Sequence, residues 1–494
     1  MRLILPYPDR SQRSFLHILD DDSLLNIFDF CRPAILDEDE ADEDRLLQGG
    51  TWGRERWWYK LAHTCRRWRY LLFASASYLG LSLVCTYGTQ LAAILAQSPP
   101  IPLIIDFILA NKISAKNQDR IILALQHRDR VRRIRLKTPL SSLYRIISAF
   151  DQEFPILDYL YIEAISEENS TLILPITFQA PHLRHLVLIK IRLSIQSPLL
   201  IDAGGVTRLV TLSLQDIRSM TGYFHPSDLL QRLSFMPFLE TLGVTFHSDT
   251  QELPLNTSTA TSVTLPNLRW FAFGGASAYL EALLPQMTPP HLEKLQLRFF
   301  DQRMFSVPCL VKFMKTFDNV EFGSAKFRFY KNAVDVEVYP YRGATMYAFS
   351  LVIDCNLLRQ QVASTARIFS ALKTVFSTVD HLTLEFLRYP IWHHADNYVD
   401  RDRWRELLRS FGNVKTLYVD DDFLGQISNC LCVRFGESAM DPLPQLKELE
   451  YSAKGTKKHA FNPFIDARKG THYPVSLVCR GSYATRGQPM SRDT

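Results

Sequence analysis

A phrase of apolar residues with the spacing L-x-x-L-x-L recurs from about residue 130 onward, and it constrains the fold more than any other feature of the sequence. Its first seven copies begin 24 to 30 residues apart. The phrase alternates as in a half-buried strand, and helical patterns such as 228–233 and 362–376 lie between copies. A strand, a loop and a helix repeated at this period predict a stack of parallel strands with helices on the other side. The copies begin at Val131, Leu157, Leu183, Leu209, Leu239, Leu268, Leu292, Val379, Val414 and Leu446.

The spacing widens to 87 residues between the seventh and eighth copies. This interval equals three periods of 29 residues, so we expect the irregular segment 299–378 to hold repeats whose phrase has degenerated. Within it, residues 326–338 alternate apolar and polar side chains around Lys331 and Asn332, which predicts a hairpin. The pattern does not indicate how such a hairpin would join the stack.

Two short amphipathic helices are predicted ahead of the repeats. Capping residues from Asp20 to Ser23 precede an apolar stripe at Leu24, Ile27 and Phe28. A second stripe follows at helical spacing, formed by Trp57, Leu61, Cys65, Trp68 and Leu72. A module of this size has little core of its own, so its apolar stripes favour docking to a partner or to the following domain.

The chain therefore divides into segments of different character. An acidic loop joins the two predicted helices, and the last residues are rich in Gly, Ser, Arg and Thr, which is typical of a frayed tail. The expected domains are an N-terminal extension at 1–14, a helical module at 15–78 with its acidic loop at 32–53, a repeat domain at 79–480 and a tail at 481–494.

Composition and charge narrow the functional classes. The net charge of +5 arises from 56 basic and 51 acidic residues, which is no whole-chain signature of nucleic-acid binding. The eight cysteines contain no C-x-x-C pair, and the N-terminus has no secretory signal, so we expect a cytoplasmic or nuclear protein. Residues 70–105 carry no charge, but their prolines and the alternation of Leu79, Leu81 and Leu83 favour strands over a membrane helix.

No catalytic constellation is found in the sequence. Gly-x-Ser-x-Gly, His-Glu-x-x-His and EF-hand patterns are missing, and the stretch 455–457 lacks the first glycine of a phosphate-binding loop. We interpret 393–396, with two histidines and an aspartate, as a solvated loop and 420–422 as a turn, since neither offers a closed ligand set. We therefore expect no enzyme activity, no cofactor and no metal site.

Two phrases at the N-terminus resemble a known family. Residues 19–28, Leu-Asp-Asp-Asp-Ser-Leu-Leu-Asn-Ile-Phe, followed by Cys-Arg-Arg-Trp-Arg at 65–69, resemble the opening and closing phrases of the F-box. Together with the repeats, they make the chain similar to the large F-box and leucine-rich-repeat family of mushroom-forming fungi. Two features depart from the family pattern: Asp20 stands where proline is usual, and residues 32–53 lengthen the link between the helices.

The resemblance implies a fold, a function and a set of partners. The fold is an α/β protein in which an F-box-like helical module precedes a leucine-rich-repeat solenoid, with parallel strands on the concave face. The function is substrate recognition in an SCF-type cullin ubiquitin ligase, in which the F-box binds the Skp-type adaptor and the repeats bind a protein substrate. The adaptor-binding residues implied are Leu19, Leu24, Leu25, Ile27, Phe28, Leu61, Cys65, Trp68 and Leu71.

The substrate face can be predicted from the repeat phrase, because residues between the apolar anchors point away from the core. The candidate residues are basic in the first copy, aromatic or neutral in the middle copies and acidic in the last, so we expect a face polarised along its length. They are Arg133, Arg135, Lys137, Tyr159, Tyr161, His185, Thr211, Trp270, Lys294, Glu385, Tyr418, Asp420, Glu448 and Glu450.

Two alternatives stay open. The chain could be a leucine-rich-repeat scaffold with no coupling to a ubiquitin ligase, an interpretation that Asp20 in place of proline favours. Less favoured is a nucleic-acid-binding repeat protein that uses the five arginines within 128–135. Because apolar anchors interleave with these arginines, we expect no nucleic-acid partner and no membrane. The sequence identifies neither the substrate nor the oligomeric state.

Overall fold

The structure is a computed structural model of the chain. It describes residues 19–33, 56–108, 113–165, 172–194, 196–200, 206–217, 225–247, 262–300, 306–316, 321–387, 399–452, 459–471 and 473–480. The chain divides into two compact units, Met1–Ala203 and Gly204–Thr494, which are described separately. The predicted extension 1–14, most of the acidic loop 32–53, the tail 481–494 and the histidine-containing loop 393–396 lie outside the described residues.

The first unit begins with three short helices. They are α1 (Asp21–Phe30), α4 (Trp57–Ala62) and α5 (Arg66–Ala74). Asp20 caps α1, because its carboxylate accepts a hydrogen bond from the backbone N–H of Ser23 at 2.7 Å. Cys65 caps α5 in the same way, since its Sγ accepts from the backbone N–H of Trp68 at 3.4 Å. The predicted start of the first helix is confirmed, whereas the second stripe, predicted as one helix from Trp57 to Leu72, is divided into α4 and α5 at Cys65.

Helices α1 and α5 are joined by one aromatic contact and one arginine. The rings of Phe28 and Trp68 meet edge to face with their centroids 5.0 Å apart. Arg67 on α5 donates to the Asp21 carboxylate at 2.7 Å and to the Leu19 carbonyl at 2.6 Å. These contacts hold the first turn of α1 against α5. Asp20 therefore caps α1, whereas Asp21 binds Arg67 of α5.

Five strands of the first unit lie side by side in chain order and run parallel. Their register places apolar anchors in rows, for example Ile134, Leu160 and Leu186. The strands are β1 (Leu83–Cys85), β2 (Leu103–Phe107), β3 (Val131–Pro139), β4 (Tyr159–Ile165) and β6 (His185–Ile189). Helices α6 (Leu91–Gln97), α7 (Ala115–Gln126) and α8 (Leu140–Ile147) connect them, and β5 (Leu172–Ile173) pairs with β7 (Ile191–Arg192) apart from this group.

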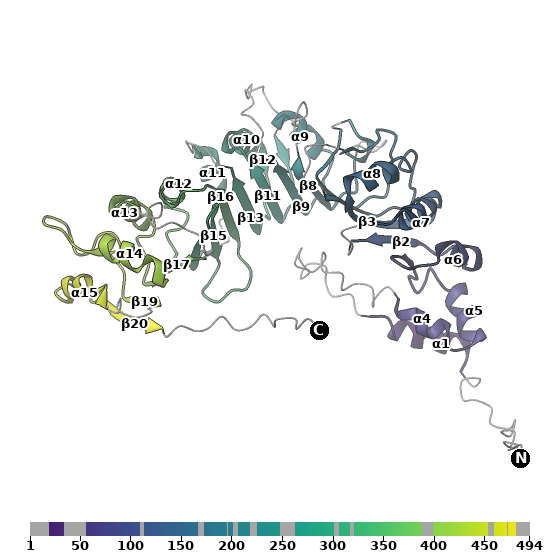
Figure 1. Ribbon diagram of the computed structural model, residues 1–494, viewed down its shortest axis with the longest axis horizontal. Coiled ribbons are helices and arrows are strands. Elements are labelled where there is room, and N and C mark those ends of the chain that lie inside the picture. Colours follow the sequence, from purple (N-terminus) through teal and green to yellow (C-terminus); the bar gives the residue numbers. More distant parts are fainter. Residues whose placement is uncertain are drawn as a thin grey trace, which may run out of the picture. The chain divides into compact units, whose positions relative to one another are not determined.

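The second unit holds eleven strands of one sheet, in the order β8-β9-β11-β13-β16-β15-β14-β17-β18-β19-β20. Helices α9 to α13 lie along one side of strands β8 to β17 (Figure 1). The strands are β8 (Thr211–Ile217), β9 (Thr241–Phe246), β11 (Trp270–Gly275), β13 (Lys294–Phe299), β14 (Ser324–Phe329), β15 (Ala333–Tyr339), β16 (Phe349–Asp354), β17 (His381–Phe386), β18 (Thr416–Val419), β19 (Glu448–Ser452) and β20 (Ser476–Arg480). The helices are α9 (Pro226–Leu233), α10 (Ser277–Leu283), α11 (Pro308–Met314), α12 (Leu358–Ala371), α13 (Arg401–Arg409), α14 (Leu424–Leu431) and α15 (Asn462–Lys469). A separate pair joins β10 (Val263–Thr264) to β12 (Met287–Thr288).

Each of the ten repeat phrases forms a parallel strand, as predicted. The thirty anchor side chains of these phrases are at most 8% exposed. Because the anchors alternate along each strand, they face the helices on one side of the sheet, and aromatic anchors such as Phe273 stack on helical residues such as Tyr279. The fold is therefore of the α/β class, with mostly parallel strands.

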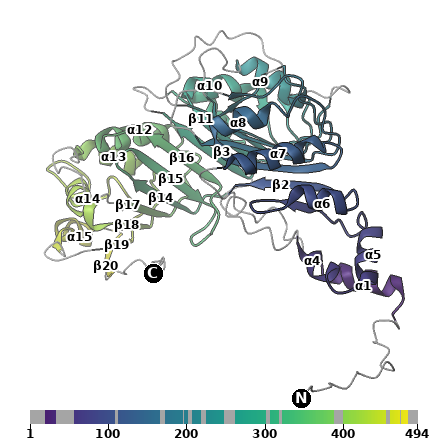
Figure 2. The same ribbon diagram turned by 45° about the vertical axis from the view of Figure 1, so that its right-hand side comes forward.

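The wide interval 299–378 contains the predicted hairpin and, among its described residues, one strand that continues the repeats. Strands β14 and β15 pair antiparallel, β15 pairs antiparallel with β16, and β14 pairs parallel with β17. The expectation of degenerate repeats is met by β16, which pairs parallel with β13 and is followed by α12, but not by β14 and β15. In the sheet, the hairpin of β14 and β15 lies between β16 and β17, although it precedes β16 in the sequence (Figure 2).

The uncharged stretch 70–105 folds into the end of α5, the short strand β1, helix α6 and most of β2. Its leucines Leu79, Leu81 and Leu83 are buried, as their alternation indicated. Among the described residues, no helix combines the length and the apolar character that crossing a membrane requires.

Candidate recognition surfaces

The side chains between the repeat anchors form rows across the face of the strands that the helices leave open. Strands lie about 4.8 Å apart, so neighbours in one row touch. In the first unit one row contains Arg133, Tyr159 and His185. In the second unit another contains Thr241, Trp270 and Lys294. This close contact decides which of the predicted recognition residues reach solvent.

The basic cluster at the start of the repeats is paired with carboxylates. Arg135 and Asp106 are 8% and 2% exposed and form an ion pair at 2.9 Å. Asp158 accepts from Arg132 at 2.7 Å and lies 3.4 Å from Arg133. Lys137 pairs in the same manner with Glu163 at 2.9 Å. The expected basic end of the face is thus a set of ion pairs rather than a positive surface.

Burial shifts the pKa of two groups in this set. It raises the pKa of the Asp106 carboxyl to about 6, although Arg135 opposes the shift. The hydroxyl of Tyr161 donates to Glu163 at 2.6 Å, and burial together with that carboxylate raises the tyrosine pKa. Tyr161 is only 5% exposed. Arg135 and Tyr161 were predicted as exposed substrate contacts, and this was wrong because neighbours in the same and adjacent rows cover them.

The open strand face of the second unit carries a lysine held between two aromatic rings. The ammonium of Lys294 lies 4.5 Å from the centroid of the Trp270 ring and 4.4 Å from that of Tyr347. Trp270 is half-buried, and its indole Nε1 is covered without a hydrogen-bond partner. Trp270 and Lys294 were both predicted, whereas Tyr347 was missed because it precedes β16 in an interval without a repeat phrase. Trp270, Lys294 and Tyr347 therefore form a site with two aromatic rings and one positive charge on this face.

The acidic end of the face is also largely neutralised. Glu385 accepts from Lys326 at 2.8 Å and lies 3.8 Å from Arg328. Glu450 is 4% exposed and pairs with Arg342 at 3.4 Å, so it was wrongly predicted as exposed. The charges predicted for both ends of the face are therefore engaged in ion pairs, and at the acidic strands the hairpin supplies Lys326 and Arg328 as partners of Glu385.

Asp420 has a structural role at the end of β18. Its carboxylate accepts from the backbone N–H of Asp421 at 2.8 Å and of Phe386 at 3.4 Å. Burial raises its pKa. The predicted turn at this position is confirmed. The other predicted recognition residues of the second unit, Thr211, Tyr418 and Glu448, are half-buried, as are Tyr159 and His185 of the first unit.

The hairpin contributes a charged cluster of its own. Arg328 contacts Glu337 at 2.7 Å and Asp335 at 3.2 Å. Burial and the neighbouring Glu337 raise the pKa of the Asp335 carboxyl to about 6, and Arg328 opposes this. Alternation within 326–338 predicted the strands. No pattern in the sequence indicated that Arg328 would lie opposite Glu385 on the neighbouring strand β17.

The predicted adaptor-binding residues divide into three groups. Leu24, Phe28 and Leu71 are at most 6% exposed and form the core of the helical module. Leu19, Leu25, Leu61 and Trp68 are half-buried, whereas Ile27 and Cys65 are exposed.

Three exposed aromatic side chains of the module, one of them Tyr78 at its last residue, were missed by the sequence analysis. Phe30 at the end of α1 is 91% exposed, and Tyr70 on α5 is 72% exposed. Phe30 lies three residues after Ile27, so helical spacing could have identified it. An open hollow beside Tyr70 is lined by Arg66, Arg69, Phe73, Ala74 and Pro99.

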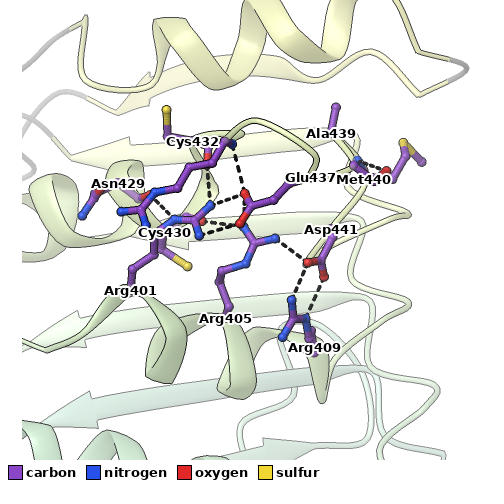
Figure 3. A network of polar contacts seen from close by, with 12 residues as sticks. Arg401, Arg405, Arg409, Asn429, Cys430, Cys432, Glu437, Ala439, Met440 and Asp441 are labelled. Carbon is purple, nitrogen blue, oxygen red and sulfur yellow. Dashed lines mark hydrogen bonds and ion pairs between the residues drawn. The ribbon is translucent and has the colours of Figure 1, made fainter.

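Three arginines of α13 form a cluster with the loop that follows α14 (Figure 3). Arg401 and Arg405 are 7% and 2% exposed, and Arg409 is exposed. Arg401 binds both oxygens of Glu437, at 2.8 Å and 2.5 Å, while Arg409 binds both oxygens of Asp441, at 2.8 Å and 2.6 Å. Arg405 contacts Asp441 as well. Two carboxylates from one loop therefore contact three guanidinium groups of one helix and offset two of their three charges.

The same arginines bind the C-terminal end of α14. Arg401 donates to the carbonyls of Asn429 at 3.2 Å and Cys432 at 2.7 Å, and Arg405 donates to that of Cys430 at 3.0 Å. Positive charge at a helix C-terminus satisfies its last carbonyls. Hydrogen bonds from Arg401 lower the pKa of Glu437 to about 2, so this carboxylate stays ionised well below neutral pH.

No group of acidic, histidine or cysteine side chains within the described ranges could hold a metal ion. The chain matches no protein-family model, and no curated protein is significantly similar to it.

Proposed function

We propose that the chain is a non-catalytic substrate-recognition subunit of an SCF-type ubiquitin ligase. In this proposal the helical module 15–78 is an F-box that binds a Skp-type adaptor. The repeat strands form a leucine-rich-repeat solenoid that binds a protein substrate on the face left open by the helices.

The observation that carries the proposal is that α1 has apolar side chains on two faces. One face is used inside the module, where Leu24 and Phe28 are fully buried. The other is exposed, with Ile27 at 40% and Phe30 at 91%. Exposed aromatic and aliphatic side chains on a short helix are typical of a partner-binding surface. The buried pair holds the helix, and the exposed pair is available to the adaptor.

The substrate side of the proposal rests on the open strand face of the second unit. Trp270 and Tyr347 supply the aromatic side chains that are enriched at interface hot spots, and Lys294 lies between their rings. The arginines near Arg133 weaken the nucleic-acid alternative, because Asp106 and Asp158 offset two of the three charges of Arg132, Arg133 and Arg135.

Co-expression with a Skp-type adaptor tests the proposal. The chain should co-purify with the adaptor, and the double variant Ile27→Glu and Phe30→Glu should not, because two carboxylates would replace the apolar contact. A matched control is Tyr144→Glu, since Tyr144 is 51% exposed on α8, outside the module. This control should co-purify normally.

A wild-type chain that folds but does not retain the adaptor would contradict the coupling to a ubiquitin ligase. The scaffold alternative would then stand, because it needs the strand face and not the exposed face of α1. The thermal transition of each variant has to match the wild type for the comparison to count.

A further inference from the structure

The loop between α14 and β19 presents an aromatic side chain at its tip. Phe435 is fully exposed, at 109% of its reference area, and its neighbour Arg434 is exposed as well. Gly436 follows with a backbone φ of 83°, a left-handed conformation that glycine adopts without strain. Phe435 is the most exposed of the large apolar side chains that the structure describes. A single exposed apolar side chain is normal on a protein surface, so what distinguishes Phe435 is the way its loop is held.

The loop that carries Phe435 is anchored before its tip by the Cys432 carbonyl, which accepts from Arg401, and after it by two carboxylates. Glu437 is held by Arg401, and Asp441 is held by Arg405 and Arg409 (Figure 3). The Glu437 carboxylate also accepts from the backbone N–H of Arg434 at 3.0 Å, which closes the tip itself. A further anchor comes from α15, where Arg468 donates to the carbonyl of Ala439 at 3.1 Å.

These anchors place charge in a costly position. Arg401 and Arg405 lie one helical turn apart on α13, both nearly buried, so they would repel each other without the two carboxylates of the loop. Buried ion pairs are a weak source of stability compared with apolar packing of the same volume. What they do provide is a fixed geometry. A loop held in one conformation loses little entropy when it binds, so its tip can form an efficient contact.

We propose that the tip formed by Arg434, Phe435 and Gly436 is a recognition element for an acidic, apolar segment of a protein partner. Charge complementarity selects this partner. The two carboxylates of the loop are engaged by α13, so the charge left at the tip is the guanidinium of Arg434, beside the Phe435 ring. A partner segment with an aliphatic or aromatic side chain flanked by Asp or Glu satisfies both groups.

This inference goes beyond the proposed function and deepens its substrate side. It rests on that proposal only in treating the chain as a protein-recognition subunit, and it does not require the adaptor. In a second copy of the chain, the tip would have to enter the hollow beside Tyr70. Arg66 and Arg69 border this hollow and would repel Arg434, which carries the same charge.

Selection of short random peptides displayed on phage, with the full chain as bait, tests the inference. Enriched peptides should combine large apolar residues with Asp or Glu. The selected peptide, made synthetically, should bind at least about tenfold more weakly to Phe435→Ser and to Arg434→Glu than to the wild type. Phe435→Ser should not affect folding, since the ring is fully exposed, and an unchanged thermal transition verifies this.

Phe238→Ser is the matched control, because Phe238 is 52% exposed elsewhere in the same unit and should leave peptide affinity unchanged. Glu437→Gln does not change the identity of the three tip residues. It should still weaken binding, because it loosens the contact between the loop and Arg401. Peptides that bind Phe435→Ser as tightly as the wild type would overturn the proposal. So would enrichment of basic peptides, a wild-type dimer lost on Phe435→Ser, or Phe435-dependent binding to vesicles of phosphatidylcholine and phosphatidylserine in place of peptide binding.

Adaptor co-purification on the same samples separates the two proposals. If Phe435→Ser keeps the adaptor and loses the peptide, both proposals stand. If the wild type binds the peptide through Phe435 but does not retain the adaptor, the ubiquitin-ligase assignment fails and the recognition tip stands.

Discussion

The substitution Asp441→Asn gives the sharpest test of the arginine cluster on α13. It removes one negative charge from a site where Arg405, with a side chain only 3% exposed, depends on that carboxylate. Breaking a buried ion pair by removing one partner costs roughly 3 to 5 kcal/mol. Asp441 itself is 32% exposed, and Arg405 keeps the carbonyl of Cys430 and lies 3.7 Å from Glu437. We therefore expect the lower end of that range, about 3 kcal/mol.

A matched control is Asp466→Asn, which removes the carboxylate of an exposed pair. Lys469 and Asp466 have side chains 70% and 65% exposed, and such pairs contribute about 0 to 1 kcal/mol. Equilibrium urea unfolding of the wild type and both variants gives the free-energy differences. Hydrogen exchange within 401–409 should rise in Asp441→Asn and stay unchanged in the control. A loss below about 1 kcal/mol for Asp441→Asn, no larger than for the control, would refute the reasoning.

Three further results are expected. Phe28→Ala should cost about 3 to 5 kcal/mol in the helical module, because the ring is fully buried against Trp68, and faster hydrogen exchange in α1 and α5 would show it. Asp106 has its pKa raised from 3.8 to about 6 in the folded chain, so the unfolding free energy should fall as pH rises between these values. In Asp106→Asn, the free energy of unfolding, measured with urea at each pH, should lose this dependence on pH. Glu437 has its pKa lowered from 4.5 to about 2, so its contribution should be complete above pH 4.5 and lost as pH falls toward 2, a slope that Glu437→Gln should abolish.

Local pattern was sufficient to predict the strands of the ten repeat phrases and the start of α1. The anchors of each phrase are buried because alternation leaves a strand only two faces, and helices cover one of them. Asp20 and Cys65 act as caps because their side chains reach the backbone N–H three residues ahead. The hairpin at 326–338 was predicted in the same way, from alternation around Lys331 and Asn332.

Contacts between distant segments could not be predicted from the sequence. Arg135 is buried beside Asp106, which lies opposite it one strand away, and this partner was not predicted because strand β2 carries no copy of the repeat phrase. The insertion of the hairpin beside β17 depends on the packing of the whole sheet, which a single strand pattern does not contain. Phe435 stands out only after the anchoring of its loop is known, since one phenylalanine in a polar stretch carries no pattern.

Hydrogen exchange of the chain with and without a Skp-type adaptor tests the proposed function most directly. The account predicts slower exchange confined to the helical module, strongest in α1 near Ile27 and Phe30 and in α5 near Tyr70, with strands β8 to β20 unchanged. Unchanged exchange in α1 and α5 at saturating adaptor, or slower exchange in the strands in their place, would contradict it.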